Sequence, residues 1–410
     1  MQQKTTYSRY SYLYYFWLFI PAIIYFAFVN NYGVNIPYRD DYRAILEFLV
    51  DFKSANFSHK VSLLFSQNNE HRILSSHILY VLYYSLFNEI NFRNIIFIGN
   101  LQLVIIFLIG VHFIKKGITD FWYIAAFVFG ICLFDISSYE NATFAMASMQ
   151  NYGVIMLFFL SLLFYSFSSL KWLIPAIFFQ GLCAFSSGNG MVAGLALVLY
   201  NLLCRNKLNT IASLVSFSTF TGLYFVNYQS PQGSLAGDTN NAITFFIHMA
   251  GAHFSYDYGL LAGILVLIAL GGILPFNSKF QFKSNVLPMI AVLIFVMASM
   301  AVTSKFRSKT IHDSYASRYL IYAHLLTGVG FFFLFIKIDK SKIKWPIIIV
   351  SLIGLLHVYK ENYNWGIGGF ERQENRIEVT DFIDHPQKDQ LREIAVQACT
   401  AGIYCIEEHR

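Results

Sequence analysis

Long apolar stretches, separated by short polar and often basic segments, follow one another along almost the whole of this 410-residue chain. The first, residues 12–29, is long enough for a helix to cross a hydrocarbon core of about 30 Å. Hydrophobic residues make up 56% of the chain and charged residues only 13%, and no soluble domain of this length hides so much apolar surface. The sequence therefore predicts an all-α polytopic membrane protein.

About eleven transmembrane helices are expected, the first as an uncleaved signal-anchor because no small-residue cleavage site follows it. The other ten are predicted at 93–114, 121–136, 152–169, 172–187, 190–204, 208–228, 258–276, 286–303, 319–337 and 345–359.

Lysine and arginine between these stretches indicate the orientation. If residues 1–9 face the cytoplasm, most basic clusters also face it, provided that residues 71–88 do not cross the membrane. We therefore expect residues 71–88 to form an interfacial or re-entrant helix in a long first outer loop; a twelve-span arrangement remains the alternative. A transmembrane domain, 1–359, would then be followed by an outer tail, 360–410.

An acidic pair stands directly after the first span, in the string Pro37-Tyr38-Arg39-Asp40-Asp41. A carboxylate held at the membrane surface can act as a general base on a substrate tethered to lipid. An ordinary solvated loop could have the same composition, so the pair alone does not distinguish a catalytic base from such a loop.

Two further polar groups lie in predicted outer segments. Glu70, His71 and Arg72 could grip sugar hydroxyls or phosphate, or could simply cap the helix that follows. Glu140 and Asn141 come just after an apolar stretch and are either substrate contacts or interface residues.

The loop 304–318 is basic although it is predicted to face outward, where positive charge hinders translocation. Lysine offers a point charge and arginine a bidentate fork for phosphate oxygens. We therefore predict that this loop binds an anionic head group; a loop paired with its own carboxylates, or a local error in topology, is the alternative. The cations concerned are Lys305, Arg307, Lys309 and Arg318.

Cys399 and Cys405 in the tail are candidates for a disulfide if the tail faces an oxidising compartment. His248 and His253 lack a third ligand in the sequence, so no metal site is predicted there. No Gly-rich phosphate loop and no nucleic-acid-binding module is present.

The order of these features resembles the membrane glycosyltransferases of the GT-C class, over roughly residues 10–340. The resemblance is carried by the first span, Asp40 and Asp41 in the long outer loop, the apolar outer helix with its polar mouth Asn69–Arg72, and Ser317-Arg318-Tyr319 opening a late span. Many members separate their two carboxylates, whereas here they are adjacent, which leaves the identity of the base open. Size, aromatic content and the outward tail also resemble the serotype-converting O-antigen glucosyltransferases that modify lipopolysaccharide.

The resemblance implies a transferase of the bacterial inner membrane, with its N-terminus cytoplasmic and its site and C-terminus periplasmic. It would move a hexose, glucose by the narrower resemblance, from undecaprenyl phosphate to a lipid-linked or surface glycan such as O-antigen. Asp40 or Asp41 would be the base, and the phosphate would leave against Arg307, Lys309 and Arg318. No cofactor is required, although Asp40 and Asp41 could hold a divalent metal. Further substrate contacts are expected from Arg39, Glu70, His71, Arg72, Glu140, Asn141, Lys305 and Tyr319.

An O-antigen polymerase or a lipid-linked oligosaccharide flippase is the main alternative, and a non-catalytic envelope protein is a third. A flippase should place charged residues inside several spans, and these span interiors are almost free of them. A polymerase usually has paired arginine-rich outer loops, whereas this chain has one strongly basic outer loop.

Overall fold

The computed structural model describes residues 13–167, 169–230, 239–255, 257–274, 284–309, 314–338, 341, 343–379 and 387–405. Most of these residues are helical. The longer helices are α1 (Ile20–Tyr32), α4 (Leu74–Phe87), α5 (Phe92–Gly117), α6 (Trp122–Leu133), α9 (Gly153–Tyr165), α10 (Leu173–Ala184), α11 (Asn189–Leu203), α12 (Lys207–Phe225), α13 (Thr239–Gly251), α14 (Gly259–Ile273), α15 (Leu287–Arg307), α16 (Leu320–Ile338), α17 (Lys344–Val379) and α18 (Lys388–Thr400).

Short elements connect them. The short α-helices are α2 (Phe48–Ser54), α3 (Phe57–Leu64), α7 (Tyr139–Thr143) and α8 (Ala145–Ala147), and the strands are β1 (Gln67–Asn68) and β2 (His71–Arg72). Stretches of 3-10 helix are Leu13–Phe19, Ile136–Ser138, Leu170–Trp172 and Ser317–Tyr319, and stretches of π-helix are Tyr42–Glu47 and Ser148–Tyr152.

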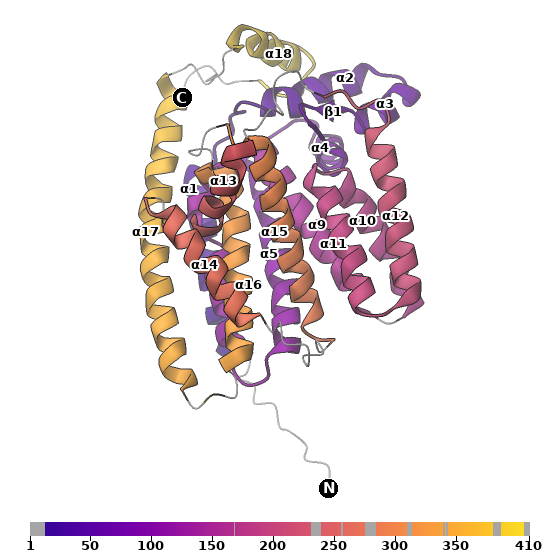
Figure 1. Ribbon diagram of the computed structural model, residues 1–410. Helices are drawn as coiled ribbons and strands as arrows, with labels where there is room; N and C mark the ends of the chain where they lie inside the picture. The colour runs from indigo at the N-terminus through magenta and orange to yellow at the C-terminus, as the bar shows by residue number, and fades with distance from the viewer. Residues whose placement is uncertain are drawn as a thin grey trace.

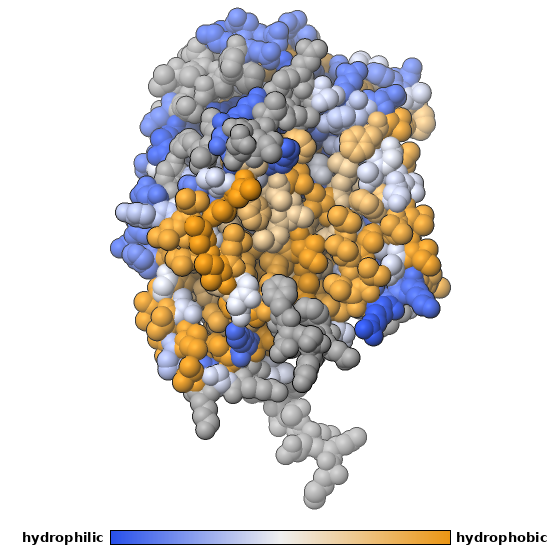
Figure 2. Space-filling view, in the orientation of Figure 1, coloured by the Kyte–Doolittle hydropathy of each residue, from blue (hydrophilic) through white to orange (hydrophobic). Residues whose placement is uncertain are grey.

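Within the described residues, six helical stretches are long and apolar enough to cross a membrane. They correspond to six of the eleven predicted spans; three more predicted spans are shorter apolar helices (α10, α11 and α14), and the remaining two lie in α12 and α17. On the face seen in Figure 2, hydrophobic residues form a broad band across the middle of the molecule, and hydrophilic residues gather above it. The six stretches are Tyr15–Tyr32, Phe92–Gly117, Trp122–Thr143, Ala145–Tyr165, Leu287–Arg307 and Ser317–Ile338.

The centre of the bundle is formed where α6 packs between α5 and α16. The ring of Phe129 on α6 lies against Gly110 of α5 and Gly328 of α16, where a Cβ atom would overlap it. Small residues let helices approach closely in a membrane, where packing rather than water drives their association. The stretches containing α6 and α16 are the most enclosed, each 72% buried against 28% for the first span, so segments that continue from them are firmly placed.

A buried hydrogen-bond network joins the first span to the segment after α6. Tyr25 donates to Oδ1 of Asn100 at 2.6 Å, and its hydroxyl lies 3.0 Å from that of Tyr152. Asn100 also donates to the carbonyl of Ala142 at 3.0 Å. These bonds satisfy polar groups that would be costly to bury alone and fix the chain on both sides of α8.

The first loop folds over one end of the bundle (Figure 1). Its helix α4 has 14 residues, a length of about 21 Å at 1.5 Å per residue, which is less than a hydrocarbon core. It packs against α2 and α3 of the same loop. This is the placement expected of residues 71–88.

Helix α17 runs through the predicted last span and on into the tail, so the predicted division between residues 359 and 360 falls inside one helix. The tail then returns across the first loop. Cys399 and Cys405 form a disulfide at the end of α18, and α18 packs against Tyr42–Glu47. Lys53 donates to the carbonyl of Ala401 at 2.7 Å, and Tyr404 donates to that of Asn35 at 2.8 Å.

Candidate functional site

Asp41 lies at the end of the loop that follows α1 and is only 1% exposed. Its Oδ2 accepts the backbone N–H of Tyr38 at 3.0 Å, and its Oδ1 accepts that of Met146 at 2.7 Å. Burial raises the pKa of Asp41 to about 7, and the charge of Asp40 adds to the rise, whereas the backbone bonds oppose it. Both carboxylate oxygens of Asp41 therefore accept backbone N–H groups, and these hydrogen bonds connect its loop to α8.

Asp40 is half-buried, and Asn69 donates to its Oδ1 at 3.4 Å. Arg39 and Asn69, on either side of this contact, both have a φ of 49°. Asparagine adopts such a backbone readily in turns, whereas arginine does so rarely, so the conformation of Arg39 depends on the fold around it. The carboxylate of Asp40 thus follows this strained residue and accepts a hydrogen bond from Asn69.

The hairpin β1–β2 brings Glu70 and His71 to the same place. The carboxylate of Glu70 forms an ion pair with Arg307 at the end of α15 and lies 3.6 Å from Nε2 of His71. Burial lowers the pKa of His71 to about 4, although the charge of Asp40 opposes this, so the imidazole is neutral at pH 7. Its Nδ1 accepts the N–H of Gly188 at 3.2 Å, which leaves the proton on Nε2, facing Glu70.

Arg72 turns the other way, because successive side chains of a strand point to opposite faces. Its guanidinium donates to the carbonyls of Tyr224 at 2.8 Å, Val226 at 2.5 Å and Phe65, and lies over the ring of Tyr224. Arg72 therefore fastens the hairpin to the end of α12.

Glu140 and Asn141, on α7, hold the segment Ser317–Tyr319, which leads into α16. The Oε2 atom of Glu140 accepts the N–H of Arg318 at 3.3 Å, and Asn141 donates to the carbonyl of Arg318 at 3.0 Å. Asn141 is fully buried and accepts from Asn151 at 2.7 Å. The guanidinium of Arg318 lies 5.3 Å from the ring centroid of Tyr319, so this cation is placed by its neighbours on both sides.

These segments enclose one cavity of about 210 Å³, which we call the polar cavity. Its volume is below the roughly 300–1,000 Å³ of pockets for drug-sized ligands, so it suits a single sugar ring or a phosphate. Carboxylates and guanidinium groups face each other across it. Its lining residues are Tyr38, Arg39, Asp40, Asp41, Asn69, Glu70, His71, Glu140, Phe144, Met146, Ala147, Gln150, Asn151, Arg307, Arg318 and Tyr319.

Two larger hollows adjoin the polar cavity. A groove of about 1280 Å³ shares Asn69 with it and runs between α10, α12 and the first loop, past apolar side chains such as Phe178, Leu182 and Phe220. A cleft of about 380 Å³ shares Tyr38, Arg39, Glu140 and Phe144 with the cavity, and its far wall is α17. The residues of α17 that line this cleft are Gly369, Arg372, Gln373 and Asn375.

The structure brings most of the candidate residues together and leaves four outside the cavity lining. The lining includes Arg39, Asp40, Asp41, Glu70, His71, Glu140, Arg307, Arg318 and Tyr319. Those outside it are Arg72 and Asn141, whose contacts are structural, and the exposed Lys305 and Lys309. Residues 310–313 of the basic loop lie outside the described residues.

Several residues of the cavity wall are not among those predicted from the sequence. The rings of Tyr38 and Phe144 pack with their centroids 4.1 Å apart and their planes tilted by 38°, and Gln150 and Asn151 complete the side formed after α8. The signal for the latter pair was their place in the same polar segment as Glu140. In the described part of the chain, the only group of three metal-ligating side chains is Asp135, His253 and His324, away from Asp40 and Asp41.

The sequence matches no protein-family model and no curated protein. Two solved structures resemble the fold: crystal structures of ArnT from Cupriavidus metallidurans, one bound to undecaprenyl phosphate and one in the apo state. For each, the sequence identity is 16% and the TM-score 0.47, and the match covers 96% of this chain and 76% of ArnT. A likeness at this level assigns no residue role and no substrate to this chain.

Proposed function

We propose that this chain is a membrane-embedded glycosyltransferase of the GT-C class that transfers a hexose from undecaprenyl phosphate to a cell-surface glycan. The site would face the periplasm across the bacterial inner membrane. Glucose as the sugar and O-antigen as the acceptor form the narrower version of the proposal, which rests on the sequence resemblance described above.

One observation carries the proposal: four segments far apart in the sequence converge on one polar cavity at an end of the apolar bundle. They contribute Tyr38–Asp41 after α1, Asn69–His71 of the hairpin, residues between Glu140 and Asn151, and Arg307 with Arg318 and Tyr319. The cavity combines carboxylates, which can accept a proton, with guanidinium groups, which can bind phosphate. It also borders an apolar groove through Asn69.

The donor would place its lipid in the groove and its phosphate in the cavity. A polyprenyl chain needs an apolar channel, and Phe178, Leu182 and Phe220 supply one. The guanidinium group of Arg318, in the lining of the polar cavity, would stabilise the charge that develops on the departing phosphate. Arg307 and Arg39 are the other cations in the lining, and the ion pair of Arg307 with Glu70 fixes its position.

Asp40 is the better candidate for the base, because both oxygens of Asp41 already accept backbone N–H groups. In the proposed step, Asp40 takes the proton from an acceptor hydroxyl. The oxygen of that hydroxyl attacks the anomeric carbon of the donor sugar. The bond between that carbon and the phosphate oxygen breaks, and its electron pair leaves with the lipid phosphate. A single displacement of this kind inverts the anomeric centre. Asp41 acts as a positioning residue.

The acceptor would enter from the cleft under α17. Gln373 and Arg372 of α17 offer hydrogen-bond donors to a sugar in this cleft. Trp365, farther down the same helix, packs on Tyr139 at 5.4 Å between ring centroids. Gly366 lets α17 approach Ile136 closely, so this part of α17 serves packing.

Mass spectrometry of the surface glycan tests the proposal, in cells with no gene, wild type, Asp40→Asn or Asp41→Asn at matched expression. Wild type should add a hexose and Asp40→Asn should not. Asp51→Asn, an exposed carboxylate on α2, is the matched control and should behave as wild type. If both folded aspartate variants still add the hexose, the proposal is wrong. A change in glycan chain length or amount at constant composition would favour the polymerase or flippase instead.

A further inference from the structure

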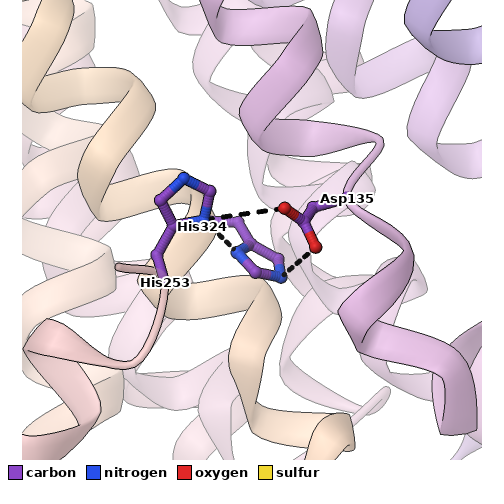
Figure 3. Close-up of side chains that lie close together, drawn as sticks. All are labelled: Asp135, His253 and His324. Atoms are coloured by element: carbon purple, nitrogen blue, oxygen red, sulfur yellow. Dashed lines mark hydrogen bonds and ion pairs between the residues drawn. The ribbon is translucent and has the colours of Figure 1, made fainter. Parts of the chain in front are cut away.

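Three side chains that no part of the proposed reaction uses meet inside the bundle. Asp135 follows α6, His253 follows α13 and His324 lies in α16; all three are fully enclosed, Asp135 being 1% exposed and the histidines 0%. Figure 3 shows them pointing at one another. We call them the His–Asp cluster. They come from three separate parts of the chain, so the fold alone brings them together.

The distances within the His–Asp cluster are short. The Nδ1 atoms of His253 and His324 are 2.7 Å apart, and Nδ1 of His253 lies 3.9 Å from Oδ2 of Asp135. One ligand atom from each residue can be chosen so that all three lie within 4.8 Å of one another. Two histidines and a carboxylate are a common donor set for Zn²⁺ and related metals.

A second layer of hydrogen bonds orients Asp135 and His324, whereas Nε2 of His253 has no hydrogen-bond partner among the described residues. Oδ1 of Asp135 accepts from the hydroxyl of Ser137 at 2.5 Å and from its N–H at 2.9 Å, and Oδ2 accepts from Asn362 at 2.8 Å. Because the Ser137 hydroxyl gives its proton to Asp135, it accepts from Nε2 of His324, 3.1 Å away. Nδ1 of His324 then carries no proton, and its lone pair points at His253. Outer hydrogen bonds of this kind set the ligating nitrogen in metal sites.

The His–Asp cluster also lacks a permanent positive charge. Within the described residues, Asp135 forms ion pairs with His253 and His324 and with no lysine or arginine. A buried carboxylate without a cation is costly. A proton shared by the two imidazoles or a bound cation would compensate it, and the donor set and its outer layer suit the second.

We propose that Asp135, His253 and His324 bind one divalent transition metal ion, Zn²⁺ or a similar cation. Ligand atoms about 2.0–2.1 Å from a tetrahedral Zn²⁺ stand about 3.4 Å apart, between the 2.7 Å and 3.9 Å seen here. Small side-chain rotations are therefore enough to admit the ion.

The ion would cross-link the two segments that line one wall of the polar cavity. Asp135 precedes Glu140 by five residues, and His324 follows Arg318 by six. Holding Asp135 to His324 would fix Glu140 against Arg318. This role is structural and does not depend on the proposed glycosyl transfer.

Metal content of the purified full-length protein tests the inference. After treatment with a chelator, the protein is dialysed against Zn²⁺ and then against metal-free buffer, and bound zinc is counted by plasma mass spectrometry. Wild type should retain about one ion per chain. Asp135→Asn and His324→Asn should bind at least about tenfold more weakly. His248→Asn is the matched control, because His248 lies on α13 but contacts Tyr315, outside the His–Asp cluster.

A second measurement needs only wild-type protein, in case the variants do not fold. Loading with Co²⁺ should give the visible absorption bands of a tetrahedral nitrogen and oxygen site. A wild-type protein that keeps no Zn²⁺ and shows no such bands would overturn the inference and leave a shared proton as the compensating charge. Retention of the ion at full affinity by folded Asp135→Asn and His324→Asn would also overturn it.

Discussion

The polar cavity and the His–Asp cluster hold similar groups but balance their charges differently. In the cavity, carboxylates such as Asp40 and Glu70 face the guanidinium groups of Arg307 and Arg318. In the cluster, the two imidazoles are the only ion-pair partners of Asp135 among the described residues. The first site is hollow and borders two larger openings, whereas the second is closed and filled by its own side chains.

This difference separates a site that can receive a substrate from one that holds the fold. A hollow lined by both signs of charge can bind an anion and accept a proton at the same time. A closed group with one carboxylate can only be compensated from within.

Exchanging a carboxylate in each site should give opposite results. Asp40→Asn should lower the transfer rate by about 10²–10⁴-fold, the usual contribution of a general base, with little change in stability. In the zinc-loaded protein, Asp135→Asn should instead lower the free energy of unfolding by about 3–5 kcal/mol, because it leaves a buried cation without its carboxylate. Transfer assays and thermal unfolding on both variants measure this; equal losses of stability would remove the distinction.

Within the polar cavity, Asp41 should behave as a buried structural group. Its pKa is about 7 in the folded protein against 3.8 for the unfolded reference, so the folded state keeps a proton that the unfolded state has lost between these values. Stability should therefore fall as pH rises from about 4 to 7, by at most about 4 kcal/mol, and level off above. Unfolding across this range checks the effect, which Asp41→Asn should remove; an unchanged profile in that variant would assign it to another group.

Two cations of the same basic segment should differ in their contribution. Arg318→Ala should reduce the transfer rate by about 10²-fold, as expected for one group that stabilises developing charge. Lys309→Ala should change it by less than about threefold, because Lys309 is exposed and outside the cavity lining. Saturating kinetics on both variants would show this; a loss with Lys309→Ala as large as with Arg318→Ala would mean that the donor extends beyond the cavity.

Removing the disulfide between Cys399 and Cys405 should have the smallest effect. The loop that it closes spans six residues, which corresponds to about 2 kcal/mol in the loop-entropy estimate. The expected result of Cys399→Ser with Cys405→Ser is faster proteolysis of the tail, with the His–Asp cluster intact. Limited proteolysis and metal content measure the two parts separately, and a loss of bound metal would show that the two ends are coupled.

Much of the fold follows from the sequence because hydropathy and charge act over whole segments. Residues 71–88 were placed outside the bundle by the positions of lysines, and α4 lies there. Glu140 can be found because it follows an apolar stretch, and Arg318 because it belongs to a basic outer segment and to the Arg-Tyr string that opens a late span. Asp40 and Asp41 could be found in the same way, but their division of roles depends on the N–H groups of Tyr38 and Met146, which no local pattern reveals.

Other parts depend on contacts between distant segments. Arg72 stands beside His71 in the sequence and turns away because of strand geometry. Asp135 lies at the end of one apolar stretch and His324 inside another. Nothing in either segment indicates that the two side chains meet. The available signal was that an ionisable residue inside or beside an apolar span needs a partner.

The return of the tail over the first loop has a consequence for the order of assembly. Arg43 donates to Gln387 at 2.8 Å, and the N–H of Ile90 donates to the carbonyl of Ile403 at 2.8 Å. Both ends of the loop that carries Asp40 are therefore fastened by residues made more than 300 positions later. During synthesis the loop that carries Asp40 emerges early. Its hydrogen bonds to Gln387 and Ile403 can form only after the last part of the chain has been made.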